Sequence, residues 1–230
     1  MAKAEALEPL PEGSVIPMAN LRTFAHSDPL PWALALVSRR AFWKAKSVVM
    51  SWALNAPGAY FGPGCHVQGA KYIRFGKHVY ATKDLWLEAV SSYDGIRYSP
   101  SLILGDRVKF SDSVHISCVE RIEIGNDVLM GSCIYISDAS HGAYHGAEQS
   151  HPSEAPANRR LKVVGHVLIE DNVFIGDQVV ILGPARIGRG AIIGAHSLIR
   201  GDIAPSTIVG GIPGRPLKQF NDALGVWERL

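Results

Sequence analysis

Residues 169–204 form six consecutive hexapeptides, IEDNVF, IGDQVV, ILGPAR, IGRGAI, IGAHSL and IRGDIA. Each begins with isoleucine, and a glycine often follows, as at Gly176, Gly188 and Gly194. A period of six fits neither an α-helix, which repeats about every 3.6 residues, nor a strand, which repeats about every two. It predicts a chain that turns a corner about every six residues, buries one branched side chain per side and winds into a three-sided prism. We expect the repeated glycines to serve corners that need a positive φ.

The same phase returns upstream, which makes a chance alternation in a β-rich domain the weaker alternative. Between Ile116 and Ile124 the spacing widens to eight, which predicts a two-residue bulge at a corner. The repeats therefore run from about Phe61 to about Ile208. The upstream hexapeptides begin at Phe61, Phe75, Leu104, Phe110, Ile116, Ile124, Met130 and Ile136.

Residues 32–54 predict a helix in an N-terminal extension that we bound at 1–58. Its apolar stripe consists of Trp32, Leu36, Trp43, Met50 and Leu54. The segment is long enough to cross a bilayer, but four central cations, each costing about 3 kcal/mol there, argue against a spanning helix. These cations are Arg39, Arg40, Lys44 and Lys46. Two alternatives remain, a helix packed on the coil or on a neighbouring subunit, and a helix that lies at a membrane surface.

The C-terminal residues 213–230 are expected to cap the coil. Pro213 and Pro216 end the repeats, and KQFNDALGVWERL (218–230) predicts a short helix that covers the last open β edge. The coil itself is expected to span residues 59–212.

The composition points to an intracellular protein without nucleic-acid partners. The chain has 23 basic and 21 acidic residues among 230, and no basic block stands out. Cys65, Cys118 and Cys133 lack CxxC spacing and are odd in number, which predicts buried free thiols. Residues 1–13, MAKAEALEPLPEG, lack the apolar stretch of a signal peptide. We therefore expect a cytoplasmic protein.

One long interruption separates Ile136 from the repeats that resume near Val163. Loops longer than about 12–15 residues are usually functional, and residues 137–162 contain His141, His145 and His151. Histidine is the side chain best suited to proton transfer at neutral pH.

The chain resembles the hexapeptide-repeat acyltransferases, and most closely the maltose, galactoside and lipopolysaccharide O-acetyltransferases. The resemblance covers roughly residues 100–220, and its most specific parts are ISDASHGAYHG (136–146) and IVGGIPGRPLK (208–218). It implies a mainly β fold, a left-handed parallel β-helix, although crossovers are usually right-handed. It also implies a homotrimer with sites between subunits.

In this family a histidine at the start of the extruded loop deprotonates the acceptor hydroxyl, and His141 matches that position. The lipopolysaccharide-type members usually have two histidines in a D-H-x-H-G arrangement, whereas this chain has Ala139 in the first place. The resemblance therefore implies that His141 is the general base, with Asp138 or a backbone carbonyl orienting its imidazole.

The resemblance also implies a site for acetyl-CoA along the C-terminal repeats. Corners around Asp177 and Ala195 match those that bind the pantetheine arm, and Phe174 replaces a tryptophan common there. Arg215 and Lys218 match basic positions near the phosphates. Arg200 is a further candidate, although its charge is displaced by one residue from the usual Thr-Lys pair.

The acceptor site is less well matched. Alignment to His141 puts Ser111 and Val119 where galactoside-type members have an Asn and an Asp, with Asp112 and Ser113 as nearby substitutes. We count Tyr144, in the loop, among the candidate substrate-binding residues. The insertion SSYDGIRYSP (91–100) either flanks a sugar or forms a plain β-hairpin.

These patterns predict an acetyl-CoA-dependent O-acetyltransferase that acts on a sugar hydroxyl, in surface-polysaccharide biosynthesis, by direct transfer with His141 as base. An N-acetyltransferase acting on an amino-sugar nucleotide and a non-catalytic β-helix scaffold are the alternatives. A zinc site of the carbonic-anhydrase type, with His141, His145 and His115, is disfavoured because its usual repeat motif is missing. No metal is expected, and peripheral contact with the inner membrane face remains open.

Overall fold

The computed structural model describes residues 29–230, so the prediction that residues 1–13 contain no signal peptide lies outside the described residues. Contacts divide the chain into two compact units, with the boundary between Phe42 and Trp43. The helix α2 (Leu30–Ala53) crosses this boundary. The second half of α2 packs on the first coil.

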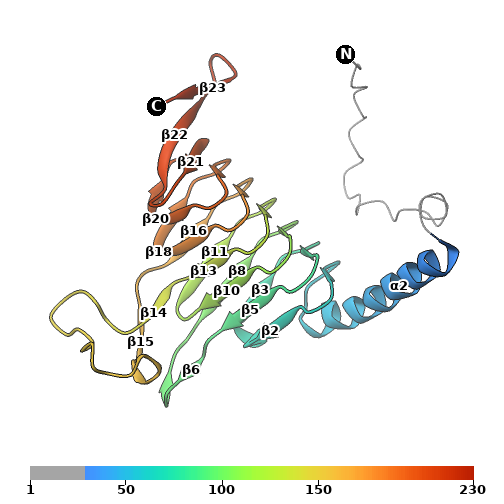
Figure 1. Ribbon diagram of the computed structural model, residues 1–230, viewed down its shortest axis with the longest axis horizontal. Coiled ribbons are helices and arrows are strands. Elements are labelled where there is room, and N and C mark those ends of the chain that lie inside the picture. The colour runs from blue at the N-terminus through green and yellow to red at the C-terminus, as the bar shows by residue number, and fades with distance from the viewer. Residues whose placement is uncertain (1–28) are drawn as a thin grey trace. The chain divides into compact units, whose positions relative to one another are not determined.

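Residues 60–210 wind as a parallel β-helix with three faces, which can be followed from β2 to β21 in Figure 1. The first face consists of β1 (Tyr60–Phe61), β4 (Tyr80–Ala81), β9 (Lys109–Phe110), β12 (Leu129–Met130), β17 (Phe174–Ile175), β19 (Ile192–Ile193) and β21 (Thr207–Gly210). The second consists of β2 (His66–Gln68), β5 (Trp86–Ala89), β10 (His115–Cys118), β13 (Tyr135–Ser137) and the first halves of β18 (Val180–Ile187) and β20 (Leu198–Ile203). The third consists of β3 (Ile73–Phe75), which follows the 3-10 turn η1 (Ala70–Tyr72), β8 (Ser101–Leu104), β11 (Arg121–Ile124), β16 (Val167–Ile169) and the second halves of β18 and β20.

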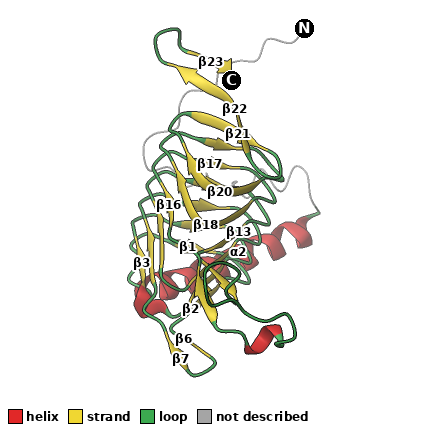
Figure 2. Cartoon of the chain, turned by 90° about the vertical axis from the view of Figure 1, so that its left-hand side faces the viewer, coloured by secondary structure: helices red, strands yellow, loops and turns green. Residues whose placement is uncertain are grey.

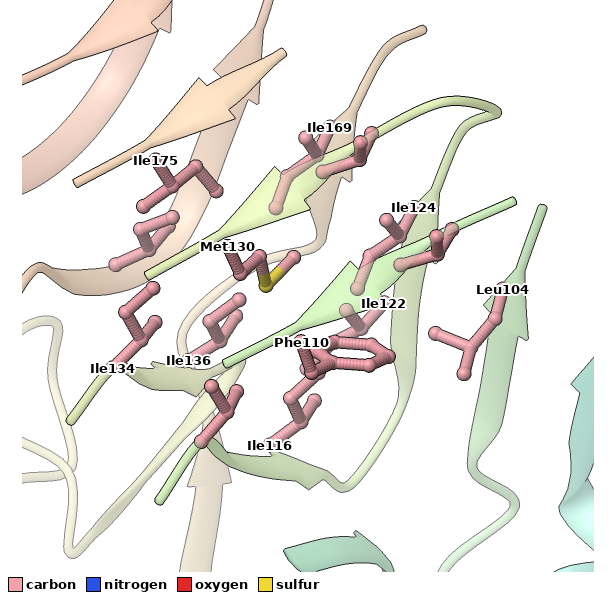
Figure 3. Close-up of a cluster of buried hydrophobic side chains, with 14 of the residues drawn as sticks. Leu104, Phe110, Ile116, Ile122, Ile124, Met130, Ile134, Ile136, Ile169 and Ile175 are labelled. Atoms are coloured by element: carbon pink, nitrogen blue, oxygen red, sulfur yellow. The ribbon is translucent and has the colours of Figure 1, made fainter. Parts of the chain in front are cut away.

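The first residues of the hexapeptides fill the interior, as the repeat predicts. Met130 pairs with Phe110 below it and with Ile175 above it, and Ile175 pairs with Ile193. All four side chains are essentially inaccessible to solvent, and Figure 3 shows the inward side chains of neighbouring coils packed against one another. The pairing of Phe110 with Met130 spans twenty residues, whereas that of Ile175 with Ile193 spans eighteen. The predicted two-residue bulge after Ile116 accounts for the longer coil.

The repeated glycines have a different purpose from the one predicted. Positive φ falls on the fourth residue of the hexapeptide, as at Arg107, Gln178 and His196, and not on the second. The glycine at the second position lies against the backbone of the next coil. A Cβ on Gly188 would lie 2.5 Å from the nitrogen of Pro205, and one on Gly176 would lie 2.7 Å from the nitrogen of Ala195. Close approach between coils therefore selects glycine there.

The exposure of the three cysteines depends on their positions in the coil. The prediction that all three are buried is correct for Cys118, where burial raises the pKa of the thiol to about 12. Cys65 is half-buried, and the prediction is wrong for Cys133, which is exposed. Cys133 occupies the fourth position of its hexapeptide, with φ of 59°, so its side chain points out from a corner.

The second half of α2 covers the first coil. Ser47 is buried, and its Oγ accepts a 2.8 Å hydrogen bond from the N–H of Phe61 and donates to the carbonyl of Ala59 at 3.3 Å. Met50 and Leu54 pack against the interior residues of the coil. This bears out the expectation of a helix packed on the coil for these residues. Among residues 29–230, the helix is not apolar enough to cross a membrane.

The C-terminal cap is a β-hairpin, and the predicted short helix is wrong. The strand β22 (Arg215–Asn221) pairs antiparallel with β21 and with β23 (Val226–Arg229), as Figure 2 shows. Phe220 and Trp227 pack with ring centroids 5.2 Å apart, and the Asn221 side chain accepts hydrogen bonds from two backbone N–H groups of the turn. The hairpin extends the first face beyond the repeats.

We predict that Gly188→Ala lowers the free energy of unfolding by about 2 kcal/mol, because the new methyl group must push two coils apart. Gly194 provides the matched control at the same hexapeptide position, since a Cβ there would lie 3.3 Å from its nearest atom, the carbonyl oxygen of Val209. Urea denaturation of both variants measures the difference. Equal losses in the two variants would contradict the role assigned to close coil-to-coil approach.

Candidate functional site

Two insertions leave the coil (Figure 2), and hydrogen bonds join them. The first is the predicted hairpin, β6 (Ser92–Tyr93) and β7 (Ile96–Arg97), with Asp94 and Gly95 at positive φ in the turn. The second is the long loop, in which β14 (Ala139–His141) pairs antiparallel with β15 (Leu161–Val163). The segment between these two strands contains the 3-10 turn η2 (Pro156–Asn158). The hydroxyl of Tyr93 donates to the carbonyl of Ala157 at 2.7 Å, and that of Tyr98 to the carbonyl of Leu161 at 3.2 Å. The two insertions thus brace each other.

His141 is exposed at the end of β14, opposite Leu161. Its imidazole contacts the ring of Tyr93 edge-on, with centroids 5.1 Å apart and an interplanar angle of 78°. Its backbone carbonyl accepts a hydrogen bond from the hydroxyl of Tyr144, which in turn accepts one from Arg159 Nη1 at 3.0 Å. Tyr144, which we expected to bind substrate, therefore supports the backbone of His141. The sequence marked Tyr144 and the insertion 91–100 that contains Tyr93, but it did not reveal the contact between Tyr93 and His141.

Asp138 has a different set of partners from the one expected. Its carboxylate is fully buried and accepts hydrogen bonds from the N–H groups of Val119, Glu120 and Arg121 at 2.7–2.8 Å. Val119 and Glu120 form the two-residue bulge of the preceding coil, and Arg121 begins the next strand, β11. The thiol of Cys118 also donates to Asp138 Oδ2, at 3.8 Å. With these four donors on its two oxygens and no contact to His141 within residues 29–230, Asp138 fixes the base of the loop.

A hollow of 360 Å³ lies at the corner between the first and second faces. Four of the predicted site residues line it: Ser111, Phe174, Asp177 and Ala195. The rings and alkyl groups of Phe174 and Leu129, 43% and 44% exposed, supply an apolar wall. The sequence thus identified the main residues of this hollow, although they come from three different coils.

One backbone donor in this hollow is left open. Asp177 Oδ1 accepts the N–H of Ser132 in the coil below at 2.6 Å. The matching position in the coil above Asp177 is Ala195, which has no side-chain acceptor. Within the described residues 29–230, the N–H of Asp177 therefore finds no partner. A polar ligand in the hollow would find a donor there.

Two other candidate acceptor residues, Asp112 and Ser113, directly follow Ser111 at the same corner. Asp112 accepts a hydrogen bond from Thr82 Oγ1 at 2.5 Å and lies 3.3 Å from Lys83 Nζ, and these partners, Thr82 first, lower the pKa of its carboxyl group. Ser113 occupies the corner itself, with φ of 59°. Neither lines the hollow, so the structure brings Ser111 to it without these neighbours.

The predicted cations fall into two places. Lys218 pairs with Ile208 and Arg215 with Gly210 across β21 and β22. Lys218 thereby continues the row of outward residues on the first face that runs upward through Phe174, Ile192 and Ile208. Arg200 is exposed on β20, on the far side of the second face, and belongs to a different surface.

A second hollow, of 490 Å³, lies on the third face beside the base of the loop. Its lining includes Glu120 and His166, which pair at 2.9 Å, together with Arg186 and Asp202. Arg186 is held by Glu170 through Nε and Nη2. No sequence motif marked this hollow, because its residues come from four adjacent strands, β11, β16, β18 and β20, and their connections.

An aromatic row on the second face also escaped sequence analysis. Trp86 and His115 stack with centroids 4.0 Å apart and an interplanar angle of 7°, and Tyr135 follows at 5.2 Å. His115 Nε2 is buried and lies 3.6 Å from Glu88 Oε2, too far for a hydrogen bond. His115 pairs with Tyr135, six residues before His141. Residues 29–230 contain no group of three His, Cys, Asp or Glu side chains that could hold a metal ion.

Comparison with known proteins gives the site a context. Residues 166–201 match the family model described as bacterial transferase hexapeptide (six repeats). The chain is 31% identical over 166 residues to a protein of Escherichia coli K12 named as a lipopolysaccharide biosynthesis O-acetyl transferase, WbbJ, covering 72% of this chain and 81% of that one. It is 26% identical to the galactoside O-acetyltransferase of the same organism, over 64% and 67% of the two chains.

Other relatives are covered less fully, and the solved structures are more distant. The chain spans about half of the serine acetyltransferase of Mycobacterium tuberculosis, at 27% identity and with 57% of this chain aligned. The structure of AntD, an N-acyltransferase from Bacillus cereus in complex with dTDP and 3-hydroxybutyryl-CoA, superposes with a TM-score of 0.53 at 17% identity, covering 73% and 82% of the chains. At that identity the likeness concerns the fold alone.

We predict that His115 makes the free energy of unfolding decrease as the pH falls below the ordinary histidine value of 6.5. Burial lowers the pKa of its imidazole, an effect that Glu88 only partly offsets, so the unfolded chain takes up the proton first as the pH falls. Stability is thus fully present above the ordinary value of 6.5 and is lost below it. Urea denaturation of wild type and His115→Phe at several pH values should give a flatter dependence for the variant. Identical pH dependence would refute this.

Proposed function

The chain belongs to the hexapeptide-repeat acetyltransferases, and from this premise we propose that it transfers the acetyl group of acetyl-CoA to a hydroxyl group of a sugar. The observation that carries the proposal is the exposed imidazole of His141 on a braced loop, in a chain 31% identical to WbbJ. WbbJ is named for lipopolysaccharide biosynthesis, and we propose an acceptor in surface-polysaccharide assembly. The same proposal includes a left-handed β-helix and a cytoplasmic location, where acetyl-CoA is available.

The 360 Å³ hollow fits the pantetheine arm of acetyl-CoA. The arm is a chain of amides and methylenes, so it needs an apolar wall and a few backbone hydrogen bonds. Phe174 and Leu129 offer the wall, and the open N–H of Asp177, beside Ala195, offers a donor to an amide carbonyl. These residues therefore suit the arm without any charged side chain.

Cations at the far end of the same row suit the phosphates of the nucleotide. Lys218 lies three strand spacings above Phe174 along the first face, or about 15 Å. Arg215 begins the same strand and is exposed. Because the arm separates the thioester from the phosphates, cations at this distance from the hollow are suitably placed. Arg200, on a different surface, is the weakest of the three assignments.

His141 acts as the general base in this mechanism. Its imidazole accepts the proton of the sugar hydroxyl as the oxygen attacks the thioester carbonyl. The new C–O bond forms, the C–S bond breaks, and the imidazolium returns the proton to the departing thiolate. General-base catalysis contributes about 10²- to 10⁴-fold, and holding both substrates together supplies the rest. Tyr93, which contacts the imidazole, and Asp138, which fixes the loop, are positioning residues.

We propose that a homotrimer completes the site. The hollow lies at the corner between the first and second faces, whereas His141 leaves the coil where the second face meets the third. No residue of the loop 137–162 lines the hollow within one chain. A neighbouring copy that presents its hollow to His141 would join the two halves, with Ser111 close to the acceptor. Tyr144 is more useful in supporting the loop than in binding the sugar.

Calorimetric titration with acetyl-CoA is the first test. We expect saturable binding that His141→Ala preserves while lowering the rate of transfer by about 10²- to 10⁴-fold. Ala195→Asp should abolish binding, because its carboxylate accepts the N–H of Asp177 and occupies the hollow. Arg215→Ala with Lys218→Ala should weaken binding of CoA more than binding of acetyl-pantetheine, which lacks the nucleotide.

Absence of binding to acetyl-CoA and to longer acyl-CoAs would favour the scaffold alternative. A matched pair of acceptors, a sugar and its amino-sugar nucleotide counterpart, separates the two transferase alternatives. Transfer only to the amine would replace O-acetylation by N-acetylation.

Mixing two inactive variants tests the shared site. Co-expressed His141→Ala and Ala195→Asp chains should form mixed trimers that recover about a quarter of wild-type activity per site, since some interfaces combine an intact loop with an intact hollow. Each variant alone should stay inactive, and each should keep the wild-type mass in solution. Mixed trimers with no recovered activity would place the whole site within one chain.

A further inference from the structure

The second half of α2 has apolar side chains on two opposite sides. Ser47, Met50 and Leu54 face the coil, as their buried contacts show. At about 100° per residue, Val48, Val49 and Trp52 fall on the opposite side. They are 63%, 64% and 84% exposed, and we call these three residues the helix stripe. A helix packed only on the coil has no need of this second apolar side.

Positive charge borders the helix stripe on both flanks. Lys44 and Lys46 lie about 100° to either side of Ala45, which is in line with the stripe. Lys46 Nζ lies 4.7 Å from the ring centroid of Trp43, which keeps its alkyl chain along the helix surface. The 24 residues of α2 include no aspartate or glutamate. The stripe and its borders therefore offer apolar contact together with attraction for anions.

We propose that the helix stripe docks on the surface of a bilayer that contains anionic lipids. Val48, Val49 and Trp52 enter the boundary between headgroups and acyl chains, while Lys44 and Lys46 contact lipid phosphates. Tryptophan favours this interfacial depth, and long lysine side chains extend from it toward water. Because α2 is not apolar enough to span a bilayer, it lies along the surface. This inference goes beyond the proposed acetyl transfer and does not depend on it.

The charges favour a lipid surface over a second copy of the chain as the occupant. A protein partner would need an apolar groove edged by acidic groups on both sides. An anionic bilayer presents both features everywhere on its surface. The lysines would also make docking sensitive to salt, since exposed charges are screened over about 8 Å at physiological ionic strength.

Flotation of the full-length protein with vesicles tests the proposal. The vesicles are phosphatidylcholine alone or a mixture with phosphatidylglycerol. We expect binding to the mixed vesicles that declines with added salt, and little binding to phosphatidylcholine. Lys44→Gln with Lys46→Gln should weaken binding about fivefold per lysine. Val49→Ser with Trp52→Ser should reduce it at least tenfold, because two apolar side chains leave the interface.

The C-terminal hairpin provides the matched control. Leu224 is 65% exposed and Arg229 is exposed, and Leu224→Ser with Arg229→Gln should leave vesicle binding unchanged. Solution mass and acetyl-CoA binding, measured on every variant, verify the fold independently of docking. No binding to anionic vesicles by the wild type, or equal binding by the stripe variants, overturns the proposal. A change of solution mass in the stripe variants would assign the stripe to a second copy instead.

Discussion

Inward side chains stack directly over one another at the spacing of neighbouring strands, about 4.8 Å, and every other position in the coil follows from this. Met130 lies between Phe110 and Ile175, so the register of the first face is set by interior packing. A slip by one residue would turn each of these side chains out to solvent. The cost of such a slip, repeated on three faces, makes the register unusually strict.

Strict register gives the outward residues a regular arrangement as well. Phe174, Ile192, Ile208 and Lys218 form a row only because their inward neighbours are stacked. The open N–H of Asp177 arises in the same way. Where one coil offers a carboxylate and the next offers alanine, the row of coil-to-coil hydrogen bonds ends and leaves a donor at the surface. The absence of one side chain is thus enough to leave a polar backbone group facing the 360 Å³ hollow.

The regular part of this molecule could be predicted from sequence, and the irregular parts could not. The period of six placed the inward residues and the bulge after Ile116, because burial repeats with the coil. The prediction of a C-terminal helix is wrong because the last open strand edge is covered by a further strand pair, β22 and β23, which the Phe220–Trp227 contact stabilises. The sequence favours positive φ for the repeated glycines at the second position of the hexapeptide, because it does not show how closely two coils approach each other. The family resemblance suggests Phe174, Asp177 and Ala195 as cofactor-binding residues. The structure shows that these three residues line one hollow.

The partners of His141 illustrate what a single motif leaves out. The motif suggested Asp138 as the group that orients the imidazole, since the two are close in sequence. The Asp138 carboxylate accepts three backbone N–H groups and the Cys118 thiol in the interior, so it has little capacity for a further partner. Removing it from the backbone groups would leave buried donors unsatisfied, at about 1–3 kcal/mol each. The ring that contacts the imidazole is that of Tyr93, which comes from a hairpin almost fifty residues earlier. An aromatic edge restrains the ring without accepting its proton, so both nitrogens remain available for proton transfer. The hairpin insertion and the loop insertion therefore act together: the loop carries His141, and the hairpin contacts its imidazole.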